Sequence, residues 1–562
     1  MPETGMTVVR PSAAESGIDK SHRRVILASS LGTVFEWYDF FLYGSLAPII
    51  SKQFFSGVNE TTGFILALFA FSAGTAVRPL GALVFGRLGD LAGRKRTFLI
   101  TIVIMGVSTA AVGMLPSYAD IGVAAPCILV GLRMLQGLAL GGEYGGAATY
   151  VAEHAPVHKR GAYTSWIQVT TTAGFVLSLL IVLVCRGVLG PQFDKWGWRL
   201  PFLVSLVLLG ISVYIRMQLS ESPVFQEMVA AGSRSKAPLT ESFARWENLR
   251  RVVPALLGAT AGQAVVAYCG QFYVLFFLTQ VLKVDPQPAS LLVVGALAIG
   301  TPFFVIFGKL SDHIGRKRLV LAGCLLAALT YFPIFKGITH YANPAIETAA
   351  ARAPVSVVAD PAHCSFQFDP LGKKRFVQSC DVAKNALAKA GVPYLNERGE
   401  GGSVAFVRVG KSDGPAIVIS SFEAVGMTAG EFKAAAERFS RLLNTAIEEA
   451  GYPPKADLAQ IHYPMVLLLL VILVLYAAMT YGPMAAWLVE LFPARIRYTS
   501  LSVSYHIGNG WLGGFLPPVV FALVAASGDI YYGLWYPVIV ALVSVVVGAL
   551  FLVDTRNRED RL

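Results

Sequence analysis

The stretch GRLGDLAGRKR at residues 86–96 has a near copy, GKLSDHIGRKR, at residues 308–318. Both fit the pattern G-[RK]-L-x-D-x-x-G-R-K-R, begin 222 residues apart and close a long apolar block. A second pair of phrases, Glu153-x-x-Pro156-x-x-x-Arg160 and Glu490-x-x-Pro493-x-x-x-Arg497, recurs in the same order, and each member is followed by a Tyr-Thr-Ser run. The chain is therefore expected to contain two related halves.

The composition is typical of a membrane protein. Hydrophobic residues make up 55% of the 562 residues, charged residues make up 14%, and the mean hydropathy is +0.59. The apolar residues form twelve blocks, many of them close to the ~20 residues with which a helix crosses ~30 Å of hydrocarbon. Examples are residues 97–115, 170–185, 200–215, 252–282, 464–480 and 533–553. We predict an all-α, multi-pass protein with twelve transmembrane helices in two six-helix halves.

The net charge of +11 is a signal of topology, because lysine and arginine cluster in alternate connections between the apolar blocks. The clusters lie at residues 23–24, 94–96, 159–160, 234–251, 316–318, 495–497 and 556–561. The positive-inside rule places these connections and both chain ends in the cytoplasm. The cations form no single basic face, so they do not indicate nucleic-acid binding.

The second half contains an insertion. Its two repeated phrases lie 115 residues further apart than those of the first half, and residues 341–460 lack the membrane pattern. VAFVRVG (404–410) and PAIVISS (415–421) predict a β-hairpin, and Thr428 with Glu431 predicts the start of an amphipathic helix that ends near Gly451. We expect a small soluble α/β domain between helices nine and ten.

The ninth block leaves a cytoplasmic loop, so the insertion is expected on the extracytoplasmic, periplasmic side. Cys364 and Cys380 are then candidates for a disulfide, with two free thiols as the alternative. The chain divides into a cytoplasmic tail (1–22), the N-terminal half (23–217), a cytoplasmic linker (218–251), helices seven to nine (252–340), the insertion (341–460), helices ten to twelve (461–555) and a second tail (556–562).

Two duplicated six-helix halves are the layout of transporters that rock around a central site. The glycines of the repeated phrase permit a tight turn, while Asp90 can accept hydrogen bonds from a helix N-terminus or pair with Arg94. We predict a conformational latch; the alternative is that the cations only obey the positive-inside rule. The latch residues are Gly86, Asp90, Gly93, Arg94, Gly308, Asp312, Gly315, Arg316, Glu153, Arg160, Glu490 and Arg497.

These phrases, together with TVFEWYDFFLYG (33–44) and GLRMLQGLALGGEYGG (131–146), resemble the major facilitator superfamily and its metabolite:proton symporter subfamily. The resemblance covers about residues 24–340 and 461–555. It implies alternating access and import of a small metabolite with a proton through a bacterial-type inner membrane. The implied substrates are organic acids such as oxoglutarate, citrate and shikimate, or osmolytes such as proline and betaine. The insertion is not part of the usual pattern.

Two acidic residues lie inside the first apolar block. Glu36 and Asp39 share a helix face near mid-membrane, where a carboxylate costs a few kcal/mol unless it is paired, protonated or wetted. We expect at least one of them to carry a proton near neutral pH; a structural salt bridge is the alternative. Arg133 in block four is the expected partner, and it can alternate between a carboxylate and an anionic substrate. The resemblance also implies a coupling role for Arg133, and Glu143 is a second candidate proton carrier.

Polar side chains without a permanent charge in the apolar blocks are candidate substrate ligands, because amides and phenols bind through directed hydrogen bonds. They are Tyr43, Gln136, Gln168, Gln263, Tyr268, Gln271, His506 and Asn509. For His506 the alternative is an interhelical hydrogen bond, and for Gln168 it is helix packing. An arginine beside such groups suits small carboxylates and zwitterions alike, so both substrate classes stay open.

Enzyme chemistry is not indicated. The sequence has no Walker phosphate loop, no Cys/His spacing of a metal site and no nucleophile with a nearby base. We expect a monomeric, non-enzymatic transporter whose partners are a small metabolite and the bilayer, with the proton as coupling ion and no other cofactor. A periplasmic ligand or protein is a further candidate partner, for the insertion. A second hypothesis is a transporter-derived sensor that binds its ligand through the insertion.

Overall fold

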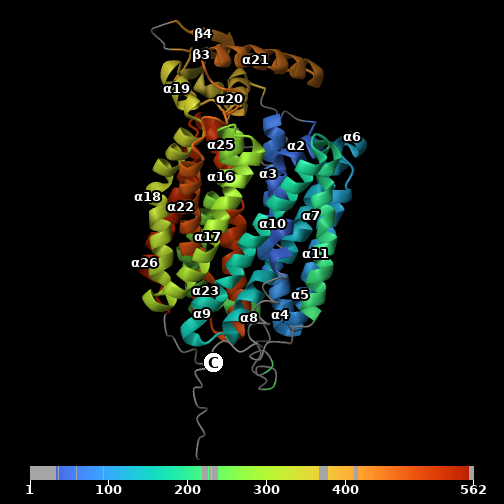
Figure 1. Cartoon of the computed structure of the whole chain (residues 1–562), viewed down its shortest axis with the longest axis vertical. Helices are drawn as coiled ribbons and strands as arrows, with labels where there is room; N and C mark the ends of the chain where they lie inside the picture. The colour runs from blue at the N-terminus through green and yellow to red at the C-terminus, as the bar shows by residue number, and fades with distance from the viewer. Residues whose placement is uncertain are drawn as a thin grey trace, which may run out of the picture.

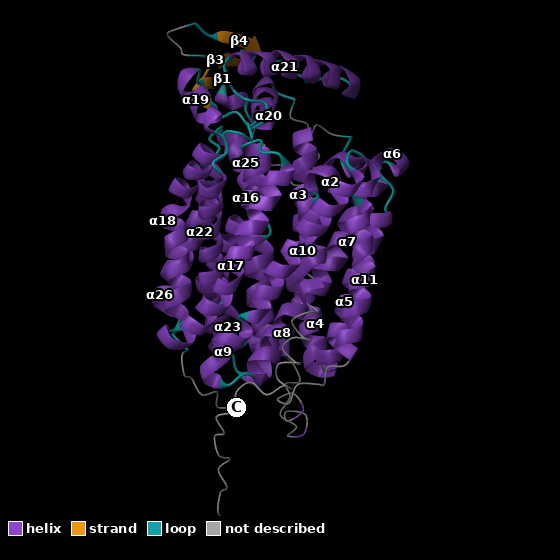
Figure 2. Ribbon diagram, in the orientation of Figure 1, coloured by secondary structure: helices purple, strands orange, loops and turns teal. Residues whose placement is uncertain are grey.

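The structure is a computed structural model that describes residues 33–35, 37–57, 60–92, 94–217, 226, 230, 238–365, 377–410 and 415–555. The chain forms a long bundle of helices with a small α/β unit at one end (Figures 1 and 2). The end that carries this unit is called the insertion end, and the opposite one, where the repeated phrases lie, the latch end.

The N-terminal half begins with a helix at residues 33–45, in which residue 36 is not described, and continues into α2 (Ala47–Phe54). The second helix of this half is interrupted at Val77, between α3 and α4. The Arg78-Pro79 pair follows directly, and a residue before proline disfavours helical geometry. The remaining elements are α3 (Glu60–Ala76), α4 (Arg78–Ala92), α5 (Arg94–Met114), α6 (Tyr118–Ile121), α7 (Ala124–Gly141), α8 (Glu143–His154), α9 (Arg160–Thr164), α10 (Trp166–Leu189) and α11 (Arg199–Met217).

The C-terminal half follows α13 (Pro238–Phe243) and contains several π-helical turns. Helix seven consists of α14 (Trp246–Ala255), α15 (Ala261–Ala267) and α16 (Val274–Phe276), with π-helical turns at Leu256–Thr260, Tyr268–Tyr273 and Phe277–Val281. The other helices are α17 (Pro286–Ile314), α18 (Arg316–Ala342), α22 (Tyr463–Tyr481), α23 (Met484–Leu491), α24 (Arg497–Ile507), α25 (Leu516–Ser527) and α26 (Trp535–Phe551), with a π-helical turn at Gly508–Gly513.

Ten helical spans of the described residues are long and apolar enough to cross a membrane, and Leu99–Met114 is a shorter apolar helix. With the first helix, which starts among the first described residues, they correspond to the twelve predicted crossings. Large apolar side chains such as Val188, Leu329 and Leu550 are exposed on the bundle surface, where a bilayer would cover them. The predicted fold class of two six-helix halves with an insertion is confirmed.

Small residues allow α7 to pack closely against the second helix of the same half. A Cβ added at Gly137 would collide with the Gly74 carbonyl group, and one at Gly141 with the carbonyl group of Arg78. Membrane helices associate through such close backbone approach, because hydrocarbon provides no hydrophobic driving force between them. This packing holds Arg133 of α7 against α3 and α4.

The insertion is an α/β unit. Its chain leaves and re-enters the bundle at neighbouring positions, where the His462 amide donates a hydrogen bond to the Tyr341 carbonyl oxygen at 2.8 Å. Its four-stranded sheet has the order β2-β1-β3-β4, with β1 and β2 parallel and the other neighbours antiparallel. The elements are α19 (Pro344–Arg352), β1 (Val355–Ala359), α20 (Ser379–Ala390), β2 (Leu395–Arg398), β3 (Phe406–Val409), β4 (Ile417–Ser420) and α21 (Ala429–Glu449).

The local predictions for this unit hold. Strands β3 and β4 form the predicted hairpin, with Val407 opposite Ile419. Thr428 and Glu431 form a capping box at the start of α21, and that helix ends two residues before Gly451. Buried side chains such as Val357, Leu387, Val407 and Leu443 form a core separate from that of the bundle.

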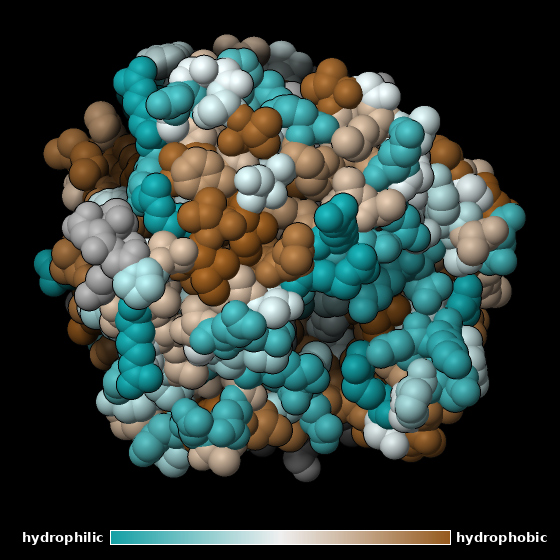
Figure 3. Space-filling model, turned by 90° about the horizontal axis from the view of Figure 1, so that it is seen from above, coloured by the Kyte–Doolittle hydropathy of each residue, from teal (hydrophilic) through white to brown (hydrophobic). Residues whose placement is uncertain are grey.

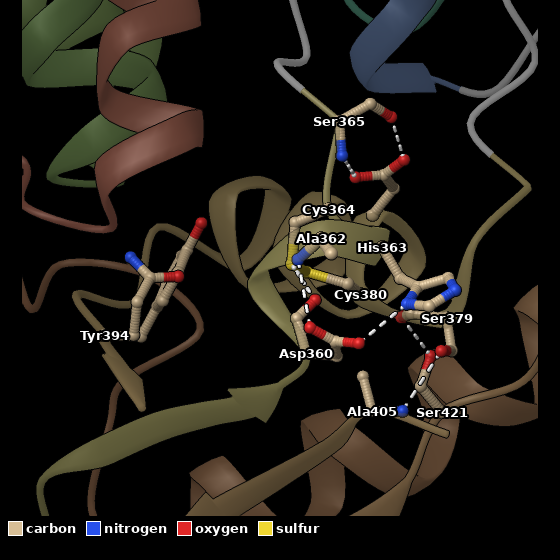
Figure 4. The surroundings of a disulfide bond; sticks show 12 residues. Asp360, Ala362, His363, Cys364, Ser365, Ser379, Cys380, Tyr394, Ala405 and Ser421 are labelled. Atoms are coloured by element: carbon tan, nitrogen blue, oxygen red, sulfur yellow. Dashed lines mark hydrogen bonds and ion pairs between the residues drawn. A yellow bond between two sulfur atoms is a disulfide. The ribbon is translucent and has the colours of Figure 1, made fainter. Parts of the chain in front are cut away.

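Cys364 and Cys380 form a disulfide that joins the turn after β1 to the start of α20, with Cα atoms 5.4 Å apart (Figure 4). Asp360 holds the same turn: its carboxylate accepts hydrogen bonds from the Ala362 amide at 3.0 Å and from the His363 ring at 2.9 Å. These bonds, the Ala362 amide first, keep the pKa of Asp360 below its usual range.

Replacing both cysteines by serine should destabilise the insertion by about 3 kcal/mol, because the cross-link closes a loop of 16 residues. Hydrogen exchange in the full-length protein would measure this as faster exchange in β1 and α20, with the bundle helices unchanged. Cys127→Ser, at an exposed free cysteine of the bundle, is the control. Equal exchange in the double variant and the parent would contradict the prediction.

Candidate functional site

Buried charged residues lie between the helices of the N-terminal half, near the middle of the bundle. Arg133 is 1% exposed, and its guanidinium carbon lies 4.4 Å from the centre of the Tyr43 ring. Its Nη1 donates to the Gln136 side-chain oxygen, and the Gln136 Nε2 donates to the Thr109 hydroxyl at 2.5 Å. Asp39, 5% exposed, lies beside Thr109. A chain of polar groups thus links the arginine to the carboxyl group.

The expected direct partnership between Asp39 and Arg133 is not seen as an ion pair in this structure. Asp39 Oδ1 has no hydrogen-bond partner among the described residues. The aromatic rings of Tyr43, Phe40 and Phe71 instead surround the Arg133 guanidinium, within 5.7 Å of their centres. Glu36, the other predicted acid, lies outside the described residues.

Glu143 has a cationic partner that the sequence pattern did not indicate. It begins α8 and forms a buried ion pair with Arg216 of α11, both side chains being at most 6% exposed. The pair joins α8 to α11 within the N-terminal half. The role of Glu143 as a second proton carrier stays a prediction.

Arg78, at the start of α4, is the main residue that we did not predict. It is 1% exposed, and its guanidinium carbon lies 4.1 Å from the centre of the Phe40 ring. Its Nε and Nη2 have no hydrogen-bond partner within the described part of the chain. Tyr268 and His506 of the other half lie close enough to interact with it electrostatically. The available signal was an arginine in the middle of the second apolar block.

The predicted ligands of the C-terminal half fall into two groups. Gln263 and Asn509 bind each other through two hydrogen bonds of 3.2 Å, and the Tyr481 hydroxyl donates to Asn509 at 2.7 Å. In contrast, the Tyr268 hydroxyl, Gln271 Nε2 and both ring nitrogens of His506 have no hydrogen-bond partner among the described residues. The interhelical hydrogen bond that was the alternative role of His506 is therefore not formed in this conformation among the described residues.

Two other predicted ligands are held in place within the N-terminal half. The Tyr43 hydroxyl donates to the Ala67 carbonyl oxygen at 3.0 Å, and Gln168 Nε2 donates to the Tyr144 hydroxyl at 3.1 Å. The first bond is structural. Gln168 nevertheless faces a small cavity, so its side chain is also within reach of a bound molecule.

Two small cavities lie where the halves meet, and Trp37 forms part of the wall of both. One, of about 20 Å³, is lined by Gln168, Tyr268 and Gln271, among others. The other, of about 10 Å³, includes Arg78, Glu143 and His506 in its wall. Each has room for little more than a water molecule. The unpaired polar groups therefore face a nearly closed space.

Aromatic side chains of the two halves pack together beside these cavities. Phe272 of helix seven packs against Phe41, Phe71 and Phe175 of the N-terminal half, with ring centres 5.3–5.9 Å apart. The Ser72 hydroxyl also donates to the Gly514 carbonyl oxygen at 2.8 Å, across the two halves.

The second copy of the repeated phrase joins the halves at the latch end. Asp312 accepts hydrogen bonds from the backbone amides of Gly161 and Ala162 in α9, at 2.9 and 3.0 Å. It also pairs with Arg316 at 2.7 Å, and Arg316 pairs with Glu490 at 3.1 Å. Asp312 therefore both contacts a helix N-terminus and pairs with the arginine four residues later.

The glycines of the second copy are required by these contacts. A Cβ at Gly308 would lie 2.5 Å from that of Ser165 in the other half, which is too close. Gly315 has a φ of +104°, a conformation that favours glycine, and an added Cβ would collide with Asp554.

The other latch residues form further contacts at this end. Arg497 lies 3.5 Å from Glu153 of the other half, and Tyr498 donates to the Gly142 carbonyl oxygen. Arg160 is buried, and Gly86 faces Tyr498. Gly93 and the side chains of Asp90 and Arg94 lie outside what the structure describes. Contacts thus join the two halves both at the latch end and, through Phe272 and Ser72, further along the bundle.

Similarities to known proteins agree with this architecture. The profile of the family "Sugar (and other) transporter" matches residues 25–243. The proline/betaine transporter of Salmonella typhimurium is 37% identical over 329 residues, which are 56% of this chain and 65% of that protein, so the chain spans less than two thirds of this relative. The shikimate transporter of Escherichia coli is 36% identical over 335 residues, 58% of this chain and 75% of that protein.

A solved structure shows the same fold. The xylose transporter of Escherichia coli, in a partially occluded inward-open conformation, superposes with a TM-score of 0.59 at 16% identity, covering 96% of this chain and 100% of that one. The paired halves, the repeated loop phrases and the similarity to the shikimate transporter establish that the chain belongs to the major facilitator superfamily of transporters.

Proposed function

We propose that this protein is a proton-coupled symporter that imports a small carboxylate-containing metabolite by alternating access. The bilayer would be a bacterial-type inner membrane, with both chain ends in the cytoplasm and the insertion in the periplasm. The alternating basic connections and the disulfide of the insertion support this orientation.

The observation that carries the proposal is the unsatisfied guanidinium of Arg78. An arginine stays charged in proteins, and a buried charge without a hydrogen-bonding partner costs several kcal/mol. Two of its donor nitrogens lack a partner, and aromatic rings provide only part of the compensation. A carboxylate can accept two parallel hydrogen bonds from such a group. Substrate binding would therefore satisfy a group that the protein itself leaves unpaired.

The relatives support a carboxylate as the recognised group. Proline, betaine and shikimate differ in ring structure and net charge, but each has one carboxylate. The organic-acid and osmolyte alternatives thus share one anchor. The rest of the substrate would bind to Tyr268, Gln271 and His506, whose polar atoms also lack a hydrogen-bond partner among the described residues. These side chains would distinguish organic acids from osmolytes.

Coupling to the proton would use the chain of groups from Asp39 to Arg133. A charged Asp39 with an unpaired oxygen in an apolar bundle costs more free energy than a neutral one. An anionic substrate that binds together with a proton adds no net charge to the bundle, whereas the anion alone would add one. The loaded carrier would therefore hold substrate and proton together and release both on the other side.

Arg78→Gln and Arg78→Lys should each lower shikimate or betaine uptake at least about tenfold, because hydrogen bonds to charged groups contribute ~1.5–3 kcal/mol. The measurement is uptake by proteoliposomes under an imposed proton gradient. Arg199→Lys, at a partly buried arginine outside the site, is the matched control. Uptake at the wild-type level in both Arg78 variants would exclude Arg78 as the anchor. A sensor would instead bind a ligand without gradient-driven accumulation in the wild type.

Asp39→Asn should abolish uphill accumulation but preserve exchange of labelled for unlabelled substrate, because asparagine resembles the protonated acid. Arg133→Lys should also lose accumulation, since lysine cannot reproduce the contacts with Gln136 and Tyr43. Asp457→Asn, at an exposed site of the insertion end, should transport normally. Accumulation that persists in Asp39→Asn, or that follows a sodium gradient instead, would contradict proton coupling through this residue.

Asp312→Asn should open the latch end, because it weakens the charge-assisted hydrogen bonds from α9 and the pair with Arg316. Each such bond is worth ~1.5–3 kcal/mol, enough to shift the open population about tenfold. Spin labels at the exposed positions Val157 and Ile314, in a background without free cysteines, would report longer distances. Lys309→Gln, on the same helix, is the control; an unchanged distance distribution in Asp312→Asn would contradict a latch.

A further inference from the structure

The larger of the two central cavities has mainly aromatic walls. Six of the eleven residues that line it carry an aromatic ring, and each of the six is at most 6% exposed. We call this space the aromatic cavity; its rings are those of Trp37, Phe41, Tyr268, Phe272, Phe304 and Tyr481. They lie inside the bundle, whereas the insertion-end face in Figure 3 mixes hydrophilic side chains with apolar patches. A ligand that reaches these rings therefore leaves bulk water behind.

The rings of the aromatic cavity belong to both halves. Trp37 and Phe41 lie on the first helix, and the other four rings lie on helix seven, α17 and α22 of the C-terminal half. Phe41 and Phe272 meet across the boundary, with ring centres 5.9 Å apart. The volume of about 20 Å³ leaves no room for a substrate while the halves lie this close. When the halves move apart, the cavity would widen into a space with aromatic walls on two sides.

Trp37 connects the aromatic cavity to Arg78. Its side chain lines this cavity and also the smaller one, whose wall includes Arg78. The Arg78 guanidinium carbon lies 5.8 Å from the centre of the Trp37 ring. A small substrate with its carboxylate on Arg78 would therefore place its opposite end against Trp37 and the neighbouring rings.

Aromatic faces are suited to bind cations. Their π-electrons attract a positive charge, most strongly when it is removed from water, and quaternary ammonium groups are recognised in this way. The hydroxyl groups of an organic acid such as shikimate would instead need hydrogen-bond partners, because a buried hydroxyl without one is costly. A cation without a carboxylate would be repelled by Arg78. The arginine and the rings together therefore favour a molecule that carries both charges.

We propose that the aromatic cavity binds a quaternary ammonium group, so that the substrate is a betaine, a small zwitterion whose carboxylate binds Arg78. This inference rests on the proposed function, because it takes Arg78 as the anchor of the carboxylate. It decides between the organic-acid and osmolyte alternatives in favour of the osmolyte.

A pair of ligands with the same shape tests the charge directly. In 3,3-dimethylbutanoate a carbon atom replaces the nitrogen of glycine betaine, so the carboxylate and the methyl groups are kept and the positive charge is lost. Calorimetry on the full-length protein in nanodiscs should show betaine binding at least about tenfold more tightly. Equal affinity, or tighter binding of 3,3-dimethylbutanoate or of shikimate, would overturn the proposal.

Variants of the rings test where the charge is recognised. Trp37→Leu should lower the affinity for betaine about tenfold and leave that for 3,3-dimethylbutanoate unchanged, because leucine keeps an apolar wall without π-electrons. Phe304→Leu, in the other half, should reduce the ratio of the two affinities in the same direction and serves if Trp37→Leu does not fold. Phe303→Leu, at a half-buried neighbour on α17 outside the lining, is the control. A wild-type ratio in both cavity variants would overturn the aromatic site, whereas a purely structural defect would weaken both ligands alike.

Failure of the proposed function can be told apart from failure of this inference. Arg78→Gln should weaken betaine and 3,3-dimethylbutanoate equally, because they share the carboxylate. If neither affinity changes in Arg78→Gln, the anchor of the proposed function is wrong. If both fall but the two ligands bind equally well to the parent, only the aromatic site is wrong. Choline, a quaternary ammonium without a carboxylate, should bind more weakly than betaine; equal binding would contradict recognition of a zwitterion.

Discussion

A guanidinium keeps its proton even in an apolar environment, and this constraint governs the centre of the molecule. Arg78 and Arg133 both lie at 1% exposure within the bundle, and aromatic rings surround both. Arg133 donates to Gln136 and has one donor nitrogen, Nε, without a partner among the described residues, whereas Arg78 has two. The helix packing holds this imbalance in place, because the glycines of α7 bring it against the backbone on which Arg78 lies. In the proposed mechanism, the carboxylate of the substrate would bind the donors that Arg78 leaves unpaired.

At the latch end, two buried acids of the C-terminal half each have several partners. Asp312 is bound by two backbone amides and Arg316, and Glu490 by Arg316 and Thr555. The two bonds from Gly161 and Ala162 cross between the halves, whereas the others hold Asp312 and Glu490 within the C-terminal half. Hydrogen bonds of this kind are individually modest, so they can break and re-form when the halves move.

Much of the fold was predictable from the sequence, because it follows from local rules. The duplicated phrases gave the two halves, the spacing between them located the insertion, and alternating side chains gave the β3–β4 hairpin. The central site was only partly predictable. Asp39 and Arg133 stand out as charges in apolar blocks, but their link through Thr109 depends on how three helices pack. The pairing of Glu143 with Arg216, and the partners that Arg78 lacks, likewise depend on contacts distant in sequence.

The hydrogen bond between Tyr341 and His462 brings the two ends of the insertion together at one point of the bundle. A segment that starts and finishes at adjacent positions can be gained or lost in evolution without shifting the helices on either side. Its presence therefore requires no rearrangement of the bundle helices beside it. By the same reasoning, this junction offers a position at which another folded module could be grafted onto the scaffold.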